Sequence, residues 1–401
     1  MENFVYNCST KVIFGRDTEM LAGEEIKSWG GTKVLIHYGS ESARRSGLLD
    51  RVEKSLQDAG LKYVLLGGVV PNPHIGKVRE GIAICKKENV DFILAVGGGS
   101  VIDSAKAIGY GAKYEGDVWE IYDGDMKYPL TDVLPLGSIV TIAAAGSETG
   151  CSSVLTNEQT LAKRGYKSEL CRPKFAIMNP ELTYTLPEYQ TMCGVVDIMM
   201  HTFERYFTPR SHNQMSDMMA VAVLKNVINN GRLVKKNPRD YQARSEILWS
   251  SNISHNDLTG LGKMEDWGTH QIEHELGGMF NVAHGAGLAA VWGSWARYVY
   301  QEDVMRFVEF ANQVWDIPVN YENLEETALM GIQMTEEYFE TLGMPTNIPS
   351  LLGRPVTENE IEQLSSSCVH FGKRTISSFK TLNKDDVAKI YEMANHCAEN
   401  K

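Results

Sequence analysis

Residues 92–103, with the sequence FILAVGGGSVID, contain one complete unit of an α/β fold. The apolar run 92–96 has the length and composition of a buried β-strand, and three glycines and a serine follow it directly. The residues after Ser100 have the apolar spacing of a beginning helix. A strand, a glycine-rich turn and a helix in this order are typical of a parallel sheet whose strands are connected by helices.

The first half of the chain repeats this alternation. Helical spacing recurs in two intervening segments, 48–56 and 78–85, whereas 117–128 interrupts the pattern. Besides 92–96, strands are predicted at 33–38 (KVLIHY), 63–66 (YVLL), 139–142 (IVTI) and 175–178 (FAIM).

After Pro180 the β-branched runs become rare and helical periodicity continues to the end of the chain. We therefore predict two domains, an α/β domain at 1–182 and an all-helical domain at 183–401. Helix starts are predicted at Thr357, whose capping box includes Glu360, and at Asn383. Helix propensity does not explain the glycines crowded into this half of the chain, at Gly260, Gly262, Gly277, Gly278, Gly285 and Gly287.

Composition excludes several classes of protein. The chain has 401 residues, is 43% hydrophobic, and carries 39 basic against 51 acidic side chains, a formal charge of −12. Extended polyanions and anionic membrane surfaces are therefore poor partners. The N-terminus lacks a signal-peptide pattern, and the longest apolar candidate, 133–145, is too short to cross a membrane. We expect a cytoplasmic protein whose seven cysteines, none in a Cys-x-x-Cys pair, are reduced thiols.

The turn formed by Gly97, Gly98, Gly99 and Ser100 is suited to hold a phosphate group. Residues without bulky side chains let main-chain N–H groups approach phosphate oxygens, and a helix N-terminus adds partial positive charge. The spacing matches neither the common dinucleotide fingerprint nor an NTPase loop. A tight turn without a ligand is the alternative.

The segment after the first predicted strand favours NADP over NAD. An acidic residue at such a strand end accepts from the free ribose hydroxyl of NAD and repels a 2′-phosphate. Here Gly39 and Ser40 leave space and a hydroxyl, and Arg44 and Arg45 follow. Glu41 weakens this inference, and a solvated helix face is the alternative interpretation of the arginines.

A carboxylate and several histidines predict a metal site in the helical half. Asp197 and His201 are four residues apart on a predicted helix and therefore lie on one face. His270, His274 and His284 follow within a short part of the chain, and their spacing does not decide which of them are ligands. Oxygen and imidazole ligands suit Fe²⁺ or Zn²⁺. The remaining histidines are interpreted as ordinary core or surface residues: His37, His74, His212, His255, His370 and His396.

A nucleotide site and a metal site together suggest hydride transfer, with the metal polarising a carbonyl and a nearby histidine relaying a proton. At this point the sequence resembles the iron-containing alcohol dehydrogenase family, in its NADPH-dependent butanol dehydrogenase and aldehyde reductase branch. The resemblance covers nearly the whole chain. It rests on 97–103, Pro71-Asn72-Pro73, Gly146-Ser147-Glu148, Thr183-x-Thr185-Leu186-Pro187, Asp197-x-x-x-His201, His270-x-x-x-His274 and His284-Gly285-Ala286-Gly287.

The resemblance implies roles for individual residues. It implies metal ligation by Asp197, His201, His270 and His284, with Fe²⁺ preferred to Zn²⁺, and a proton-transfer role for His274. It also implies a Rossmann-like domain followed by an all-helical one, the dehydroquinate synthase-like architecture, with the active site in the cleft between them. The implied cofactor contacts are Gly39, Ser40, Asn72, Gly97, Gly98, Gly99, Ser100, Asp103, Thr141 and Lys163.

Two positions depart from the pattern of that branch. Gly150 stands where a larger amide is usual near the nicotinamide, which puts substrate choice in doubt. Asn179 stands where an aspartate is usual before the proline, and we expect this change to affect a turn rather than the chemistry.

The function predicted from the sequence is NADP(H)-dependent interconversion of short- to medium-chain aldehydes and alcohols by a homodimer. A dehydroquinate synthase-like lyase, which uses NAD and a metal, is the first alternative. The apolar residues near the predicted ligands, such as Met199, Met200 and Trp267, do not suit its phosphorylated substrate. A nucleotide-binding sensor with a residual site is the second alternative.

Overall fold

The computed structural model describes residues 1–160, 162–209 and 213–396. The chain divides into two compact units, one comprising Asn7–Leu186 and the other comprising Met1–Tyr6 together with the chain from Pro187 onward. The boundary predicted between 182 and 183 differs from this division by the short Thr183–Leu186 connection. The first six residues join the helical unit, where the Glu2 main-chain N–H donates to the Gly262 carbonyl at 2.8 Å.

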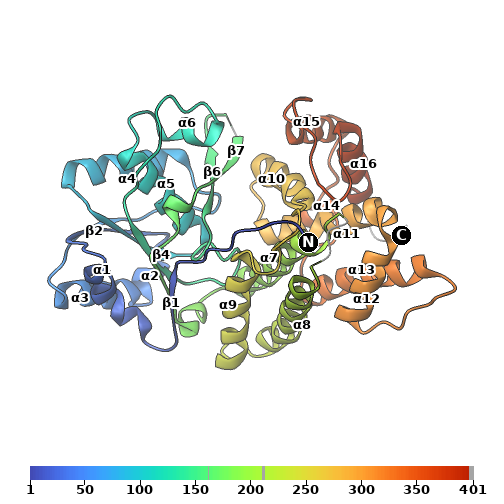
Figure 1. The fold of residues 1–401 in the computed structure, drawn as a ribbon, viewed down its shortest axis with the longest axis horizontal. Helices are drawn as coiled ribbons and strands as arrows, with labels where there is room; N and C mark the ends of the chain where they lie inside the picture. The colour runs from blue at the N-terminus through green and yellow to red at the C-terminus, as the bar shows by residue number, and fades with distance from the viewer. Residues whose placement is uncertain (161, 210–212, 397–401) are drawn as a thin grey trace. The chain divides into compact units, whose positions relative to one another are not determined.

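The first unit is built on a six-stranded parallel sheet, as the alternation of strands and helices predicted (Figure 1). Its spatial order is β1-β8-β5-β4-β2-β3. The strands are β1 (Lys11–Phe14), β2 (Lys33–Tyr38), β3 (Lys62–Leu66), β4 (Phe92–Gly97), β5 (Leu136–Val140) and β8 (Phe175–Met178).

The strand predictions at 33–38, 63–66, 92–96 and 175–178 are confirmed, whereas the prediction at 139–142 was wrong in its bounds. β5 begins earlier because Leu136 pairs with Ile93, and it ends at Val140, which pairs with Gly97. The Thr141 N–H still donates to the Gly97 carbonyl at 3.0 Å, but the chain then leaves the sheet. β1 was not predicted.

Helices cover both faces of the sheet (Figure 1). One face packs against α1 (Ala22–Ser28) and α3 (Leu48–Asp58), and its core includes Ile26, Leu49 and Val52 at zero exposure. α4 (Ile75–Glu88) and α5 (Gly99–Lys113) pack against each other on the opposite face. Two short helices, α2 (Ser42–Arg45) and α6 (Val118–Asp123), lie in connections, and α6 occupies the segment where the predicted pattern breaks.

An antiparallel hairpin, β6 (Ser152–Asn157) and β7 (Ala162–Lys167), forms a second, two-stranded sheet. Its strands contain few β-branched apolar residues, so the sequence did not predict it. The Thr156 N–H donates to the Pro73 carbonyl at 2.9 Å, so the hairpin is attached to the 71–74 loop.

Asn179 shows why an amide suits this position. Its side chain accepts from the Glu181 N–H, and its amide nitrogen donates to the buried carboxylate of Glu19 at 2.9 Å. Arg51 donates to the other Glu19 oxygen at 2.9 Å. An aspartate at 179 would place a second carboxylate against Glu19. Asparagine suits this position because its amide nitrogen can donate to the Glu19 carboxylate.

His37 lies on β2, between β4 and β3, with zero exposure. Its Nδ1 is 3.0 Å from the Leu66 carbonyl and its Nε2 is 2.8 Å from the Ser104 hydroxyl, so the neutral ring satisfies both neighbours. Burial lowers the pKa of His37 to about 4. The interpretation of His37 as an ordinary core or surface residue agrees with these contacts.

The lowered pKa of His37 predicts a pH-dependent stability. An unfolded histidine titrates near 6.5, so the stabilisation is complete above that pH and is lost as the pH falls from 6.5 toward 4. The loss amounts to about 3 kcal/mol for a shift of this size. Urea unfolding of wild type and His37→Gln across this pH range should show a shallower pH dependence in the variant. Equal slopes would contradict the assignment.

The second unit is helical, as predicted. Its principal helices are α7 (Glu188–Tyr206), α8 (Gln214–Lys236), α9 (Tyr241–His255), α10 (Gly268–Phe280), α11 (His284–Val299), α12 (Val304–Trp315), α13 (Leu324–Thr341), α14 (Ile348–Leu352), α15 (Glu358–Cys368) and α16 (Lys384–Ala394).

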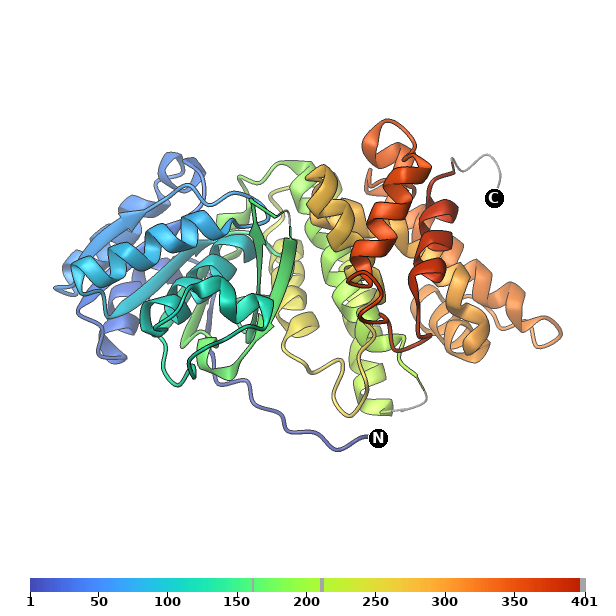
Figure 2. The ribbon, with the colours of Figure 1, turned by 90° about the horizontal axis from the view of Figure 1, so that it is seen from above.

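Both predicted helix starts in this unit are confirmed. Thr357 and Glu360 form a reciprocal capping box before α15, and Asn383 and Asp386 form another before α16. α15 and α16 lie side by side (Figure 2). No helix in the described part of the chain is both long and apolar enough to cross a membrane. Cys397 and His212 lie outside the described residues; the other six cysteines are free thiols.

Candidate active site

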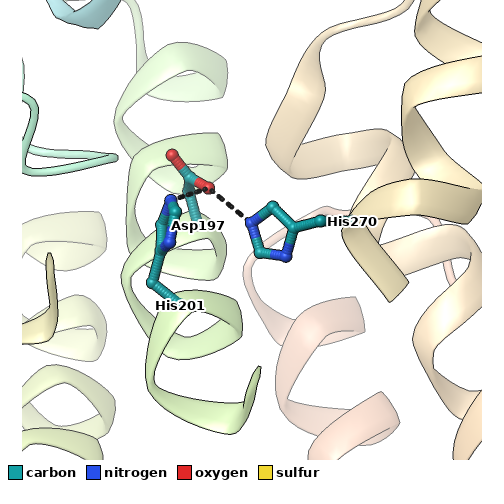
Figure 3. A group of neighbouring side chains, drawn as sticks. All are labelled: Asp197, His201 and His270. Atoms are coloured by element: carbon teal, nitrogen blue, oxygen red, sulfur yellow. Dashed lines mark ion pairs between the residues drawn. The ribbon is translucent and has the colours of Figure 1, made fainter. Parts of the chain in front are cut away.

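Four predicted ligands converge in the helical unit. Asp197 and His201 lie one turn apart on α7, His270 is in the first turn of α10, and His284 is the first residue of α11. One carboxylate oxygen, Asp197 Oδ1, is 3.6 Å from His201 Nε2, 4.0 Å from His270 Nε2 and 3.7 Å from His284 Nε2. Figure 3 shows the Asp197 carboxylate directed toward the rings of His201 and His270. Residues separated by more than eighty positions therefore present their donor atoms to one point.

Burial keeps His201 and His270 neutral. It lowers the pKa of His270 to about 3 and holds the pKa of His201 well below its usual range, and the neighbouring histidines and Arg205 add to both shifts. His284 is less buried, with 29% of its side chain exposed. A neutral imidazole has a lone pair available for a metal, so these shifts favour ligation over ion pairing.

The donor set fits a divalent transition metal. Among the described residues, the buried Nε2 of His270 has no hydrogen-bond partner, which is costly for a polar atom unless a ligand satisfies it. One carboxylate and three imidazoles suit Fe²⁺ or Zn²⁺. His274 is half-buried one turn beyond His270, with its ring centroid 5.8 Å from that of His284 and 6.4 Å from that of His270.

The sequence did not reveal the side chains that contact the Nδ1 atoms of the three imidazoles. His270 Nδ1 is 2.8 Å from Glu204 Oε1, His284 Nδ1 contacts Glu273 Oε2, and His201 Nδ1 is 3.3 Å from His255 Nδ1. Glu204 could have been found, because 197, 201 and 204 share one helix face. His255 was interpreted as an ordinary residue, and no sequence signal distinguishes it.

Trp267 adds an aromatic side chain to the histidine cluster. Its ring centroid is 5.6 Å from that of His201 and 5.2 Å from that of His270, and the Arg205 guanidinium lies 4.9 Å from it. Trp267 has a φ of 65° immediately before α10. Such backbone strain in a non-glycine residue is common at functional sites.

The glycine turn of the first unit has the features of a phosphate cradle. Gly98 precedes α5, whose first residues are Gly99 and Ser100. A side chain on Gly98 would overlap Ile142, but one on Gly99 would meet Ala145 only at 3.9 Å. The internal packing therefore does not require glycine at 99, whereas close approach of a ligand would. The first N–H groups of α5 also lack intrahelical acceptors.

Asp103 fastens the adjoining loop. Its carboxylate accepts from the Ser147 hydroxyl at 2.6 Å and from the Val154 N–H at 2.9 Å. The buried Lys106 Nζ donates to the Ser147 carbonyl at 2.8 Å and to the Ser152 carbonyl at 2.7 Å. The structure thus gives Asp103 a role in holding the 147–154 segment, which contains the buried Gly150.

The other predicted cofactor residues lie at loop and strand positions of the same unit. Thr141 follows β5, Lys163 is on β7, and Asn72 has a φ of 55° in the loop before α4. Gly39 directly follows β2, and Ser40 is exposed. A Cβ on Gly39 would meet Val101 at 3.5 Å and the Val69 carbonyl at 3.6 Å, which are ordinary contacts, so glycine is not required by packing.

Of the two arginines that follow β2, Arg44 is paired with Glu41. The two form a loose ion pair of 3.7 Å, and Arg44 is 42% exposed. Nearly half of the Arg44 side chain thus stays open to solvent.

Two family models match the chain in succession. The iron-containing alcohol dehydrogenase model matches residues 9–180, and the C-terminal model of the Fe-containing alcohol dehydrogenase family matches residues 191–395. The chain belongs to the iron-containing alcohol dehydrogenase family. This match confirms the family resemblance inferred from the motifs. It also confirms the predicted function, metal-dependent alcohol dehydrogenase or aldehyde reductase activity, in preference to the lyase.

Relatives in this iron-containing family match the chain over almost its full length. NADH-dependent butanol dehydrogenase A of Clostridium acetobutylicum is 38% identical and covers 98% of this chain and 99% of its own. The NADPH-dependent aldehyde reductase YqhD of Escherichia coli is 30% identical over 98% of this chain and 100% of its own. The crystal structure of NADH-dependent butanol dehydrogenase A from Thermotoga maritima superposes with a TM-score of 0.94 at 35% identity, covering 99% of each chain.

Proposed function

We propose that this chain reduces short- to medium-chain aldehydes to alcohols with NADP(H), using a divalent metal held by Asp197, His201, His270 and His284. The observation that carries this proposal is the approach of three imidazole Nε2 atoms to one Asp197 oxygen within 4.0 Å. Fe²⁺ is the expected ion, given the family's iron-containing description.

The four residues would hold the ion, with the Asp197 carboxylate offsetting its charge in a buried position. When bound, the ion supplies Lewis acidity, which polarises a carbonyl and lowers the pKa of an alcohol. The neutral His201 and His270 rings stay available as donors because burial prevents their protonation. Trp267 makes edge-to-face contacts with the rings of both histidines.

The glycine turn and its neighbours would bind the dinucleotide. Main-chain N–H groups at Gly98, Gly99 and Ser100 suit the pyrophosphate, while Asp103 holds the adjoining loop in place. Thr141, Lys163 and Asn72 are proposed to contact the rest of the cofactor.

We propose NADP(H) rather than NAD(H) because Gly39 and Ser40 present no carboxylate to a 2′-phosphate, and Arg44 and Arg45 are nearby in sequence. The butanol dehydrogenase relatives are named as NADH-dependent, whereas the aldehyde reductase is named as NADPH-dependent. Specific activity with each cofactor decides between these expectations.

A panel of short and medium aldehydes, assayed with NADPH and NADH after reconstitution with Fe²⁺ or Zn²⁺, tests the proposed function. Metal- and NADPH-dependent reduction is expected. Full activity after chelation would contradict the metal role. A lyase would regenerate its cofactor, so net NADPH oxidation separates the two reaction classes.

His274 is proposed to transfer the proton that the reduction requires, through an imidazole nitrogen. His274→Phe is expected to lower kcat about 100-fold, the usual contribution of a positioned acid or base. The Kd for Co²⁺ should stay at the wild-type value. If Co²⁺ affinity falls together with kcat, His274 is a ligand instead; an unchanged kcat would contradict the proton-transfer role.

A homodimer and a cytoplasmic location are the remaining proposals. Closed two-fold oligomers are the commonest assemblies of soluble enzymes, which is the only basis for the dimer. Light scattering coupled to gel filtration measures the mass in solution, and a monomeric mass of 44.7 kDa would contradict it. Cell fractionation tests the location.

A further inference from the structure

We propose that Glu204 and Glu273 are positioning residues, whose carboxylates fix the tautomer and orientation of His270 and His284 for metal binding. The inference rests on the proposed metal site, but neither carboxylate is itself a proposed ligand. Both are buried, with exposures of 2% and 0%. Each reaches the Nδ1 atom of a ring whose Nε2 faces Asp197.

The hydrogen bonds at Glu204 determine the tautomer of His270. Glu204 Oε1 is 2.9 Å from the His270 main-chain nitrogen and 2.8 Å from its ring Nδ1. An ionised carboxylate can only accept, so Oε1 accepts both from the main-chain N–H and from the Nδ1–H of the neutral ring. The lone pair of the ring must then be on Nε2, the atom that faces Asp197.

Glu204 also fixes the position of His270. Its own main-chain carbonyl accepts from the Asp266 N–H at 2.8 Å, just before α10 begins. The Asp266 carboxylate in turn accepts from the Gly268 N–H at 2.9 Å. One residue of α7 therefore holds both the start of α10 and the ring of its first-turn histidine.

Glu273 performs the corresponding task for His284. His284 opens α11 and is the most exposed of the three rings, so packing restrains it least. Glu273 approaches it from α10, and a side chain on Gly287 would overlap the Glu273 carboxylate. Gly287 thus leaves the room that Glu273 occupies, which explains one of the glycines that helix propensity did not.

The third ring, His201, is backed by another imidazole. His201 Nδ1 faces His255 Nδ1 at 3.3 Å, so one nitrogen donates and the other accepts. His270 and His284 are instead backed by carboxylates, which raise the basicity of a ligand and complement the cation. The proposed positioning by a carboxylate therefore applies to His270 and His284 and not to His201.

The test titrates metal-free wild type, Glu204→Gln and Glu273→Gln with Co²⁺ alone and records both Kd and the visible absorption of the bound ion. Each glutamine preserves the shape of the side chain but removes its charge. We expect Kd to weaken about 10- to 100-fold in each variant, with a shifted Co²⁺ spectrum. Glu273→Ala, which also removes the acceptor, should bind Co²⁺ more weakly than Glu273→Gln.

Glu336→Gln is the matched control. Glu336 is a buried carboxylate of the same unit, packed against Gly293 and paired with Arg297 at 2.8 Å, and it forms none of the contacts described for the cluster. Its substitution should leave Co²⁺ affinity and spectrum unchanged, even if the thermal midpoint of the metal-free protein falls. Equal weakening in the control would overturn the proposal, because general destabilisation would then explain it.

Two different failures can be told apart. If wild type and His270→Ala bind Co²⁺ equally, the proposed metal site itself fails. If His270→Ala loses binding while Glu204→Gln and Glu273→Gln keep the wild-type Kd and spectrum, the metal site stands and the positioning role is wrong.

Discussion

His270→Ala is expected to lower kcat/KM for aldehyde reduction by about a thousandfold, equivalent to about 4 kcal/mol of transition-state stabilisation. The ring contributes a buried Nε2 that lacks a hydrogen-bond partner among the described residues, so its principal use in the site is ligation. Removing it leaves two imidazoles and one carboxylate. The measurement is steady-state kinetics with NADPH, after reconstitution with excess Fe²⁺.

The control for this substitution is His396→Ala, at an exposed position near the end of the described chain. Its kcat/KM should equal that of wild type. Chelation of the wild-type enzyme should reproduce the loss seen in His270→Ala, and added Fe²⁺ should restore only the wild type. Activity in His270→Ala within a few-fold of wild type would exclude a catalytic metal at this position.

The fold could be predicted where a continuous apolar run was the dominant signal in the sequence. Buried parallel strands appear as continuous apolar runs, and 33–38 and 175–178 were found with the correct bounds. The hairpin β6–β7 escaped because Arg164 and Lys167 break any apolar alternation. β5 was misplaced because Thr141 and Ile142 continue its composition, although sheet pairing ends at Val140.

The candidate site could be predicted in its donor atoms but not in its supporting groups. Helical spacing joins Asp197 to His201, whereas only the folded chain brings His284 to them. Spacing alone left the ligands undecided among the histidines. The roles of Glu204 and Glu273 depend on which ring nitrogen each carboxylate reaches, and this is a property of side-chain rotamers that no sequence pattern records.

The predicted cofactor site differs from the predicted metal site, because its prediction rests on glycines, which lack side chains. Gly99 and Gly39 have room for a Cβ in the folded unit, so their glycines are not explained by packing. The assignment of these glycines to a dinucleotide site stays a prediction from the sequence. The sequence could not show that Asp103 is engaged by Ser147 and Val154.

Gly39→Asp is expected to convert the cofactor preference. The backbone at 39 does not have a positive φ, and an added Cβ would make contacts of 3.5 and 3.6 Å with Val101 and the Val69 carbonyl, so the fold should tolerate the change. The new carboxylate would stand directly after β2, where it would repel a 2′-phosphate and accept from a free ribose hydroxyl.

The expected result is a loss of about 100-fold in kcat/KM with NADPH, about 2.8 kcal/mol, which is within the range of like-charge repulsion at a protein surface. Activity with NADH should be retained or rise. Gly39→Asn separates charge from size, because it adds a side chain of similar volume without charge; it should lose much less with NADPH. If wild type already prefers NADH more than tenfold, the NADP(H) proposal is wrong, while the metal-dependent reduction is unaffected.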